Sequence, residues 1–230
     1  MPLKISILTM FPSMFDSVKE NPVVKRALDR GLLELEYVDI KNYARGSFRR
    51  IDDSPCGGGP GMIIRIDVVM KALSAVRTPS SLVVLLTPKG RVYNQAQAHE
   101  FTRCSHIVLI CGHYEGIDAR IEKHVDLMLS VGDYILTGGE IPAMAVVDSV
   151  SRLMGTIREG STAEESHENI LLEYPQYTKP ADYEGDSVPE VLLSGNHELV
   201  EKWRHEQAME ITKNLRPDLY EVYLRKVASP

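Results

Sequence analysis

Residues 131–144, V-G-D-Y-I-L-T-G-G-E-I-P-A-M, hold three glycines and a proline around a short apolar run. The preceding apolar segment ends at Val131, residues 132–133 interrupt it, residues 134–136 resume it, and a glycine pair interrupts it again. Glycine allows backbone conformations and close approaches that other residues do not. The pattern is typical of a loop wrapped around a ligand.

A helix is predicted to follow this loop, from Ile141 to Met154, with Pro142 in its first turn. Asp148 and Arg152 lie four residues apart on it, the spacing of an ordinary surface ion pair. The apolar side chains expected to point inward are Ala143, Val146, Val147, Val150 and Leu153.

Three apolar segments, at 82–86, 106–110 and 125–131, each run into a loop rich in glycine or polar residues. Helical segments separate them, which predicts a parallel α/β sheet. Ligands of such sheets bind at the carboxyl ends of the strands, so the three loops could converge on one small molecule. The alternative is that each glycine only makes a tight turn.

The first quarter of the chain has its own signals. Alternation over residues 4–9 predicts a strand, Asn21-Pro22 marks the start of a helix that Gly31 ends, and residues 33–40 read as a second strand. Residues 41–62 are basic, then glycine-rich, with little apolar content. We predict a loop there.

The composition bounds the class of protein. A chain of 230 residues that is 43% hydrophobic fits one large domain with a smaller appendage. No apolar run approaches the roughly 20 residues of a membrane span, and the amino terminus leads directly into a strand. We therefore expect a cytoplasmic protein with no membrane partner. The net charge of −6 requires that any surface for nucleic acid be a local basic patch.

Several kinds of site are excluded by missing motifs. The sequence contains no G-x-G-x-x-G after a strand, no G-x-x-x-x-G-K-[ST] and no H-E-x-x-H. Cys56, Cys104 and Cys111 lack the spacing of a zinc site or a disulfide framework, and we expect reduced thiols. A ligand should therefore be held by backbone groups and apolar walls.

The last third of the chain changes character. Residues 155–169 are polar and are predicted to be a linker, or a lid that orders on binding. A small helical domain should follow. The apolar positions expected to face its interior are Leu199, Trp203, Met209 and Ile211.

Six motifs in the same order resemble those of the bacterial tRNA (guanine-N1)-methyltransferases. They are G-G-G-P-G-M, C-G-H-Y-E-G-I-D, V-G-D-Y-I-L-T-G-G-E-I-P-A-M, D-S-V-S-R, L-L-E-Y-P-Q-Y-T-K-P and V-L-L-S-G-N-H. The resemblance implies an S-adenosylmethionine-dependent homodimer that methylates N1 of guanine 37, immediately 3′ of the anticodon in tRNA.

The resemblance also implies a fold that the strand pattern alone would not reveal. It is a trefoil-knotted parallel sheet with flanking helices, plus a small helical C-terminal domain. The implied boundaries are 1–154 for the knotted catalytic domain, 155–169 for the linker or lid, and 170–230 for a tRNA-binding domain.

Site residues follow from the same resemblance. The expected cofactor-binding residues are Leu85, Leu86, Pro88, Gly112, Glu115, Val131, Gly132, Tyr134, Leu136, Gly138, Gly139 and Pro142. The expected substrate-binding residues are Asp133, Ser166, Ser194, Asn196 and His197. No metal ligand is assigned, although the family's magnesium requirement makes Mg²⁺ a second candidate cofactor, linked to Glu115. Alternatively, Glu115 and Asp133 only cap loop amides.

The chemistry explains the two expected catalytic residues. Guanine N1 carries a proton at neutral pH, so the site needs a base near N1 and a cation near O6. Arg152 matches the family's arginine for O6. The family's base is an aspartate before a serine, and here Glu165 precedes Ser166 on a linker that looks about two residues shorter.

Alternatives remain open at this point. Glu164, Glu168 and His167 are rival bases within the same linker. Because the family's aspartate is missing, a non-catalytic RNA-binding protein is one alternative function, and a knotted ribose 2′-O-methyltransferase is another.

Overall fold

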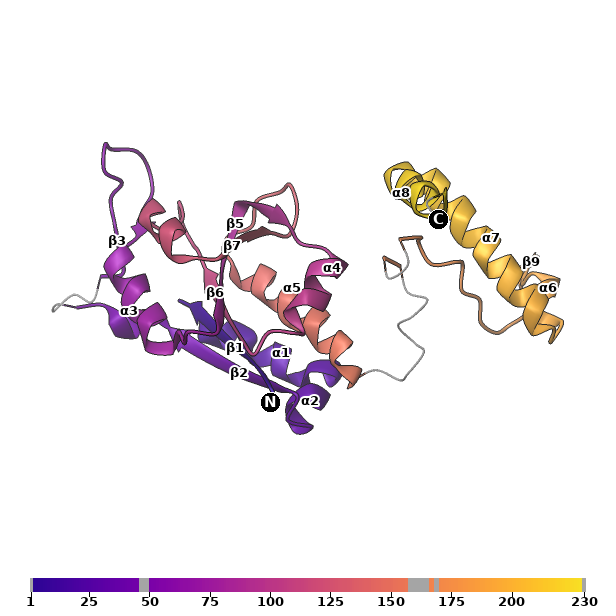
Figure 1. Cartoon of the computed structure of the whole chain (residues 1–230), viewed down its shortest axis with the longest axis horizontal. Coiled ribbons are helices and arrows are strands. Elements are labelled where there is room, and N and C mark those ends of the chain that lie inside the picture. Colours follow the sequence, from indigo (N-terminus) through magenta and orange to yellow (C-terminus); the bar gives the residue numbers. More distant parts are fainter. Residues whose placement is uncertain (1, 46–49, 157–165, 168–169, 229–230) are drawn as a thin grey trace. The chain divides into compact units, whose positions relative to one another are not determined.

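The computed structural model describes residues 2–45, 50–156, 166–167 and 170–228 (Figure 1). The chain divides into two compact units, residues 1–157 and 158–230, named here the first and the second unit. No helix within the described residues is long and apolar enough to cross a membrane.

A five-stranded sheet forms the centre of the first unit. Its strands are β1 (Leu3–Thr9), β2 (Leu33–Asp39), β5 (Ser81–Val92), β6 (His106–Cys111) and β7 (Leu127–Ser130). Their order is β2-β1-β6-β5-β7, and every pairing is parallel. The predicted parallel sheet is confirmed. All six residues of β6 are buried, as expected for a central strand covered on both faces.

Side chains alternate between two apolar cores, one on each face of the sheet. On one face Ile107 and Leu109 pack with the helices that carry Val24, Phe101 and Val147. On the other, Val108 and Ile110 pack against the elements that carry Val69 and Ile121. The first group of helices is α2 (Pro22–Asp29), α4 (Gln95–Phe101) and α5 (Glu140–Ser151), and the second is α3 (Ile66–Val76) with the 3-10 helix η3 (Ala119–His124). Helices thus flank the sheet on both sides.

Short elements complete the first unit. They are η1 (Pro12–Phe15), α1 (Asp16–Glu20), η2 (Ile40–Tyr43), β3 (Asp52–Asp53) and β4 (Ile63–Ile64). Residues 41–62 were predicted as a loop throughout, and this is wrong at both η2 and β3. Strand β3 pairs with β4, so part of the glycine-rich segment is fixed by antiparallel hydrogen bonds.

The start of α2 follows its sequence signal. Asn21 Oδ1 accepts a hydrogen bond from Val23 N at 2.9 Å, and Pro22 occupies the first helical position. Asn21 Nδ2 also donates to Asp148 Oδ1 at 2.9 Å. One residue therefore caps α2 and joins it to α5, and Asp148 has a partner outside its own helix.

Strand β5 is longer than predicted. The loop expected at residues 87–90 continues as strand to Val92, with a register shift between Leu86 and Arg91 where β5 pairs with β7. A Cβ on Gly90 would overlap the backbone of Leu129. The glycine thus serves close packing of two strands instead of a turn.

The carboxyl end of α5 also differs from the prediction. The regular helix ends at Ser151, and residues 152–156 form a wider turn in which Gly155 has φ of 69°. The first four of the five predicted inward side chains are fully buried, whereas Leu153 is half-buried. Arg30 Nη1 donates to Gly155 O at 3.0 Å, which holds the end of this turn against the end of α2.

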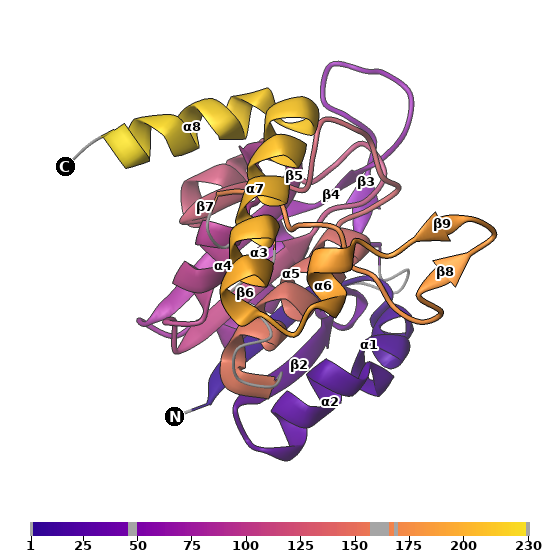
Figure 2. The ribbon, with the colours of Figure 1, turned by 90° about the vertical axis from the view of Figure 1, so that its right-hand side faces the viewer.

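The second unit contains a hairpin and three helices in its described part (Figure 2). They are β8 (Asp182–Tyr183), β9 (Asp186–Ser187), α6 (Glu190–Leu193), α7 (His197–Leu215) and α8 (Pro217–Ala228). Thr212 Oγ1 accepts from Leu172 N at 2.8 Å and ties the preceding extended segment to α7. Leu199, predicted to face the interior, is 50% exposed, because it lies in the first turn of α7 beyond the packed stretch around Ala208.

A buried polar chain crosses the amino-terminal end of the sheet. His106 Nε2 lies 2.9 Å from Ser6 Oγ, which donates to Glu36 Oε2 at 2.7 Å. His106 Nδ1 lies 2.7 Å from Ser81 Oγ. Because the Ser6 hydrogen points to Glu36, His106 donates from Nε2 and accepts at Nδ1, as a neutral imidazole. Burial lowers the pKa of His106, and Lys4 contributes in the same direction.

This arrangement predicts a pH-dependent stability. Below the ordinary imidazole value of 6.5 the unfolded chain binds a proton that folded His106 resists. The free energy of unfolding should therefore fall as pH decreases through that value. Urea unfolding followed by far-UV circular dichroism at about pH 7.5 and 5.5 measures this slope, and His106→Gln should flatten it. An equal slope in His106→Gln would contradict the assignment.

Candidate functional site

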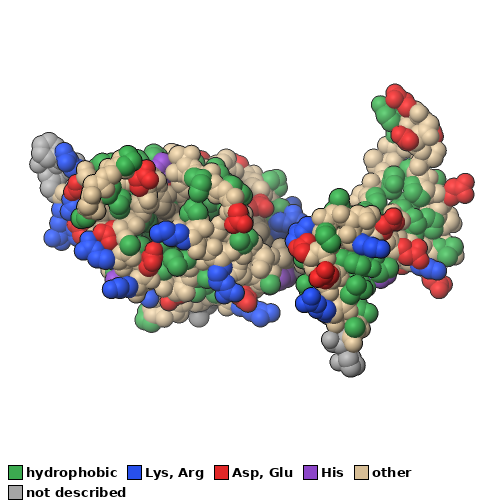
Figure 3. Space-filling model, turned by 90° about the horizontal axis from the view of Figure 1, so that it is seen from above, with side chains coloured by type: hydrophobic (Ala, Val, Ile, Leu, Met, Phe, Trp, Pro, Cys, Tyr) green, Lys and Arg blue, Asp and Glu red, His purple; other side chains and the backbone are tan. Residues whose placement is uncertain are grey.

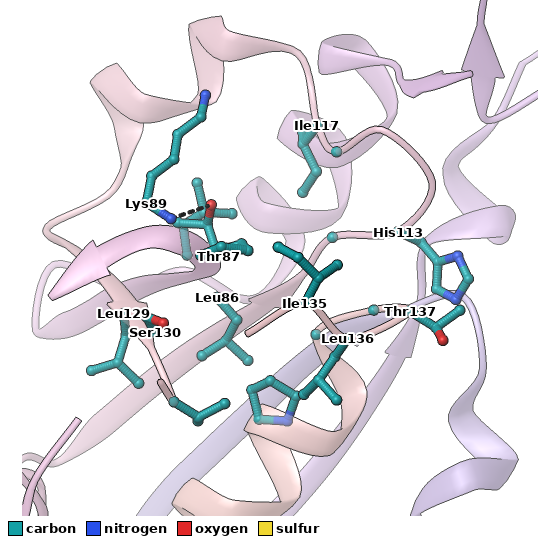
Figure 4. A pocket seen from close by; sticks show the side chains of 18 of the residues that line it. Leu86, Thr87, Lys89, His113, Ile117, Leu129, Ser130, Ile135, Leu136 and Thr137 are labelled. Carbon is teal, nitrogen blue, oxygen red and sulfur yellow. Dashed lines mark hydrogen bonds between the residues drawn. The ribbon is translucent and has the colours of Figure 1, made fainter. Parts of the chain in front are cut away.

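A cavity of about 340 Å³ lies at the carboxyl ends of β5, β6 and β7. Residues of all three segments that the sequence predicted as loops line it, although the first of these segments continues strand β5. In Figure 4, Leu86, Ile135 and Leu136 point into the cavity, with Leu129 and Ser130 on one side and His113 and Thr137 on another. Eleven of the twelve residues predicted to bind a cofactor line it: Leu85, Leu86, Pro88, Gly112, Glu115, Val131, Tyr134, Leu136, Gly138, Gly139 and Pro142.

The twelfth residue, Gly132, is not among the lining residues. Its φ is 149°, and a Cβ there would meet the ring of Tyr134. Gly132 thus lets the loop turn so that Tyr134 can line the cavity. Asp133 is exposed and is also absent from the lining.

Gly139 lets two segments of the cavity wall touch. A Cβ on this buried residue would lie 2.7 Å from Cys111 Cα and 3.1 Å from Gly112 N. Gly139 N donates to Gly112 O at 2.9 Å, and Gly138 pairs with His113 in an antiparallel bridge. The loops after β6 and β7 are therefore joined backbone to backbone, which explains the glycine pair.

The glycine-rich segment before β4 contacts one residue of the cavity wall, Glu115. Glu115 N donates to Met62 O at 3.1 Å, and a Cβ on Gly61 would overlap the Glu115 side chain. Gly61 has φ of 82°, a conformation that favours glycine. Glu115, a lining residue, is thereby held between two glycine loops.

Cys111, the buried residue before Gly112, is chemically inert. Burial raises the pKa of its thiol well above the usual range, and the nearby Glu140 carboxylate adds to this effect. The neutral thiol is a structural group, as predicted from its spacing.

Large apolar side chains are exposed around the cavity. Tyr114 is 51%, Tyr134 56% and Ile135 79% exposed. A second cavity, of about 310 Å³, shares His113 with the first, and its wall includes three further exposed side chains, Phe11, Met14 and Ile141. Exposed apolar groups at this density mark a surface that another molecule covers.

Of the two expected catalytic residues, the structure describes only Arg152, which does not line the cavity. Arg152 follows the 12-residue helix α5, whose first turn carries the lining residue Pro142. At about 1.5 Å per residue, Arg152 lies roughly 15 Å along the helix from Pro142. Glu165 and its rivals Glu164 and Glu168 lie outside the described residues, whereas the rival His167 is described and exposed.

Four of the five expected substrate-binding residues lie in the second unit, whereas Asp133 lies in the first. Ser166 Oγ accepts from Glu173 N at 2.9 Å, so this end of the predicted linker folds onto the segment that follows it. Asn196 caps α7 by accepting from Leu199 N at 3.3 Å, and Ser194 Oγ donates to Val191 O at 2.7 Å. Ser194, Asn196 and His197 are exposed and available to a partner.

The described residues contain no cluster of three or more His, Cys, Asp or Glu side chains able to hold a metal ion.

Sequence reasoning missed lining residues that neighbour the predicted ones, namely Thr87, Lys89, His113, Tyr114, Gly116, Ile117, Ile121, Glu122, Leu129, Ser130, Ile135 and Thr137. Most belong to the three loops already identified, so loop membership was the available signal.

Comparison with known proteins decides the family. The model of the family described as tRNA (Guanine-1)-methyltransferase TrmD matches residues 3–222. The chain belongs to this family. The matched residues span both units and include all six motifs that carry the resemblance.

Curated relatives agree with this assignment. The tRNA (guanine-N(1)-)-methyltransferase of Malacoplasma penetrans is 46% identical over 225 residues, which cover 97% of this chain and 100% of the relative. Those of Ruminiclostridium cellulolyticum and Clostridium perfringens are 46% and 45% identical, with 95% of this chain covered in both cases and 96% and 94% of the relatives. Membership in the tRNA (guanine-1)-methyltransferase family therefore extends over nearly the full length.

Proposed function

We propose that this protein transfers a methyl group from S-adenosylmethionine to N1 of the guanine immediately 3′ of the anticodon in tRNA. The observation that carries the proposal is the family match across residues 3–222. The curated relatives of this chain are named tRNA (guanine-N(1)-)-methyltransferase. The cavity at the carboxyl ends of β5, β6 and β7 supports the proposal, because it offers room for a small-molecule cofactor.

The cavity fits the proposed cofactor. Its volume, about 340 Å³, lies in the range of roughly 300–1,000 Å³ usual for small-molecule sites. Leu86, Leu129 and Leu136 offer apolar walls for a flat base, and the glycine loops expose backbone groups. S-adenosylmethionine supplies the methyl group when bound. Glu115 is the acid in the wall to which a Mg²⁺ requirement would be linked.

Arg152 and Glu165 are proposed to prepare the guanine. Loss of the N1 proton leaves negative charge on O6, so the fixed cationic fork of Arg152 lowers the energy of that state. A carboxylate at Glu165 accepts the N1 proton. The rate of methyl transfer then depends on how well guanine N1 is aligned with the methyl carbon.

The separation of Arg152 from the cavity supports a homodimer. Roughly 15 Å of helix lies between Arg152 and the lining residue Pro142 in one chain. A second copy that packs on the exposed Phe11, Met14 and Ile141 would bury an apolar surface and could bring its own Arg152 to this cavity. We infer that each catalytic site is completed by the partner copy.

Two close backbone approaches support the trefoil knot that the resemblance implies. Gly90 packs against Leu129, and Gly139 against Cys111, each without room for a side chain. Such contacts between distant segments suit a chain that passes through its own loop, an arrangement that proteins otherwise avoid.

The test is to incubate the protein with unmodified tRNA and S-adenosylmethionine labelled in its methyl group, and then to map the label. We expect one label per tRNA at N1 of the guanine 3′ of the anticodon. Label on a ribose, or binding of tRNA without label, would reject the proposal.

The second unit is proposed to bind tRNA. On the face that Figure 3 shows, Lys and Arg of the first unit are interspersed with Asp and Glu. This face of the first unit therefore does not favour the phosphates of tRNA over the second unit. A chain ending at Gly160 keeps both apolar cores. It should remain dimeric by light scattering and bind S-adenosylmethionine, but lose tRNA affinity.

Salt dependence is the companion measurement. Phosphate contacts release counterions, so tRNA affinity of the full chain should fall with salt concentration. Salt-independent binding, or full tRNA affinity in the shortened chain, would contradict the role of the second unit.

A further inference from the structure

A buried carboxylate begins α5 directly after the cavity loop. Glu140 is only 2% exposed, and its Oε1 accepts a hydrogen bond from Thr9 Oγ1 at 2.8 Å. Burying a charged group is costly unless it is hydrogen-bonded. Its place in the first turn of a 12-residue helix adds a favourable interaction with the helix dipole.

The partner of this carboxylate belongs to the rigid centre of the sheet. Thr9 is the last residue of β1, which pairs with both β2 and β6, and it is fully buried. Its Oγ1 also accepts from Phe11 N at 2.9 Å, where the chain turns away from the strand. The Thr9 hydroxyl therefore has one hydrogen to donate, and Glu140 receives it.

The other side of the carboxylate touches the cavity loop. A Cβ on Gly138 would overlap Glu140 Oε2 and would lie 2.5 Å from His113 Cδ2. Gly138 is thus enclosed between the Glu140 carboxylate and the His113 ring, while Gly139 N is bonded to Gly112 O at 2.9 Å. Any movement of Glu140 would move a loop whose residues line the cavity.

We propose that Glu140 is a positioning residue for cofactor binding, which holds the loop 137–139 in its binding conformation by linking it to Thr9. The inference rests on the proposed function, because it assumes that the cavity takes S-adenosylmethionine. The hydrogen bond between Thr9 and Glu140 attaches the loop after β7 to β1. This attachment is separate from the hydrogen bond between Gly139 N and Gly112 O, which attaches the same loop to the one after β6.

The test measures the dissociation constant for S-adenosylmethionine by calorimetry, together with the thermal midpoint of unfolding. Thr9→Val removes the donor and should raise the dissociation constant about tenfold, the loss expected for a hydrogen bond to a charged group. Thr9→Ser keeps the hydroxyl and should bind nearly as wild type. Glu140→Gln removes the charge and should also weaken binding.

A double variant identifies the link itself. If Thr9 and Glu140 act through one contact, the loss of binding free energy in the double variant Thr9→Val with Glu140→Gln should be measurably smaller than the sum of the two single losses. The matched control is Thr102→Val, which removes a hydrogen bond to His99 O at the end of α4 and should leave cofactor affinity unchanged.

The outcomes separate this inference from the proposed function. Wild-type protein that fails to bind S-adenosylmethionine would reject the proposed function. Suppose instead that Thr9→Val and Glu140→Gln bind S-adenosylmethionine as tightly as the wild type and differ only in a lower thermal midpoint. The link would then stabilise the fold without positioning the loop.

Discussion

Glu165→Gln is expected to lower the single-turnover rate of tRNA methylation by roughly 10²–10⁴-fold. Glutamine keeps the shape and the hydrogen-bonding capacity of the side chain but cannot accept the N1 proton. Binding of tRNA and of S-adenosylmethionine should barely change. Rapid-quench measurement with enzyme in excess isolates the chemical step from product release.

The neighbouring residues supply the controls. Glu165→Asp shortens the reach by one methylene and should lose much less activity than glutamine, provided that the linker can adjust. Parallel changes at Glu164, Glu168 and His167 test the rival bases. If Glu165→Gln is fully active and one of the other three collapses, the base is assigned to the wrong residue. If all four remain active, general-base catalysis from this segment is wrong.

Gly139→Val should reduce the affinity for S-adenosylmethionine by roughly 10- to 100-fold while the fold persists. Even the first added carbon would lie 2.7 Å from Cys111 Cα, a backbone atom that cannot rotate away. The loop must separate from Gly112, at a cost of about 1–3 kcal/mol for overpacking. Calorimetry gives the affinity, and circular dichroism verifies the fold.

Gly112, whose carbonyl accepts a hydrogen bond from Gly139 N, provides a matched comparison. A Cβ on Gly112 would meet nothing closer than Ile117 Cγ1 at 3.7 Å, an ordinary contact. Gly112→Ala should therefore leave the two loops together, and any loss of affinity would report contact with the cofactor itself. Normal cofactor binding by folded Gly139→Val would remove Gly139 from the site.

Local sequence signals predicted the elements better than their ends. Continuous apolar runs marked β5, β6 and β7, because strands covered on both faces exclude polar residues. The pattern failed at residues 87–90, where Pro88 and Gly90 read as a turn. Gly90 is instead required by the backbone of Leu129, a contact between segments that no local pattern contains.

The candidate site shows the same division. The glycines after β6 and β7 indicated the cavity, since their position after a strand is a local property, whereas Gly90 lies within β5 and does not line it. The role of Glu140 was not predicted, because its partner Thr9 is 131 positions away. Arg152 was assigned from a motif, and only the length of α5 indicated how far it lies from the lining residue Pro142 of its own chain.

The helix that separates Arg152 from the cavity has a genetic consequence. If each site draws its cavity from one copy and its arginine from the other, Gly139→Val and Arg152→Ala chains are both impaired alone, yet a mixed dimer regains one intact site. Two defective alleles would then complement each other in one cell. A chain carrying both changes would instead be dominant-negative, because every dimer that it enters with a normal copy has both sites damaged.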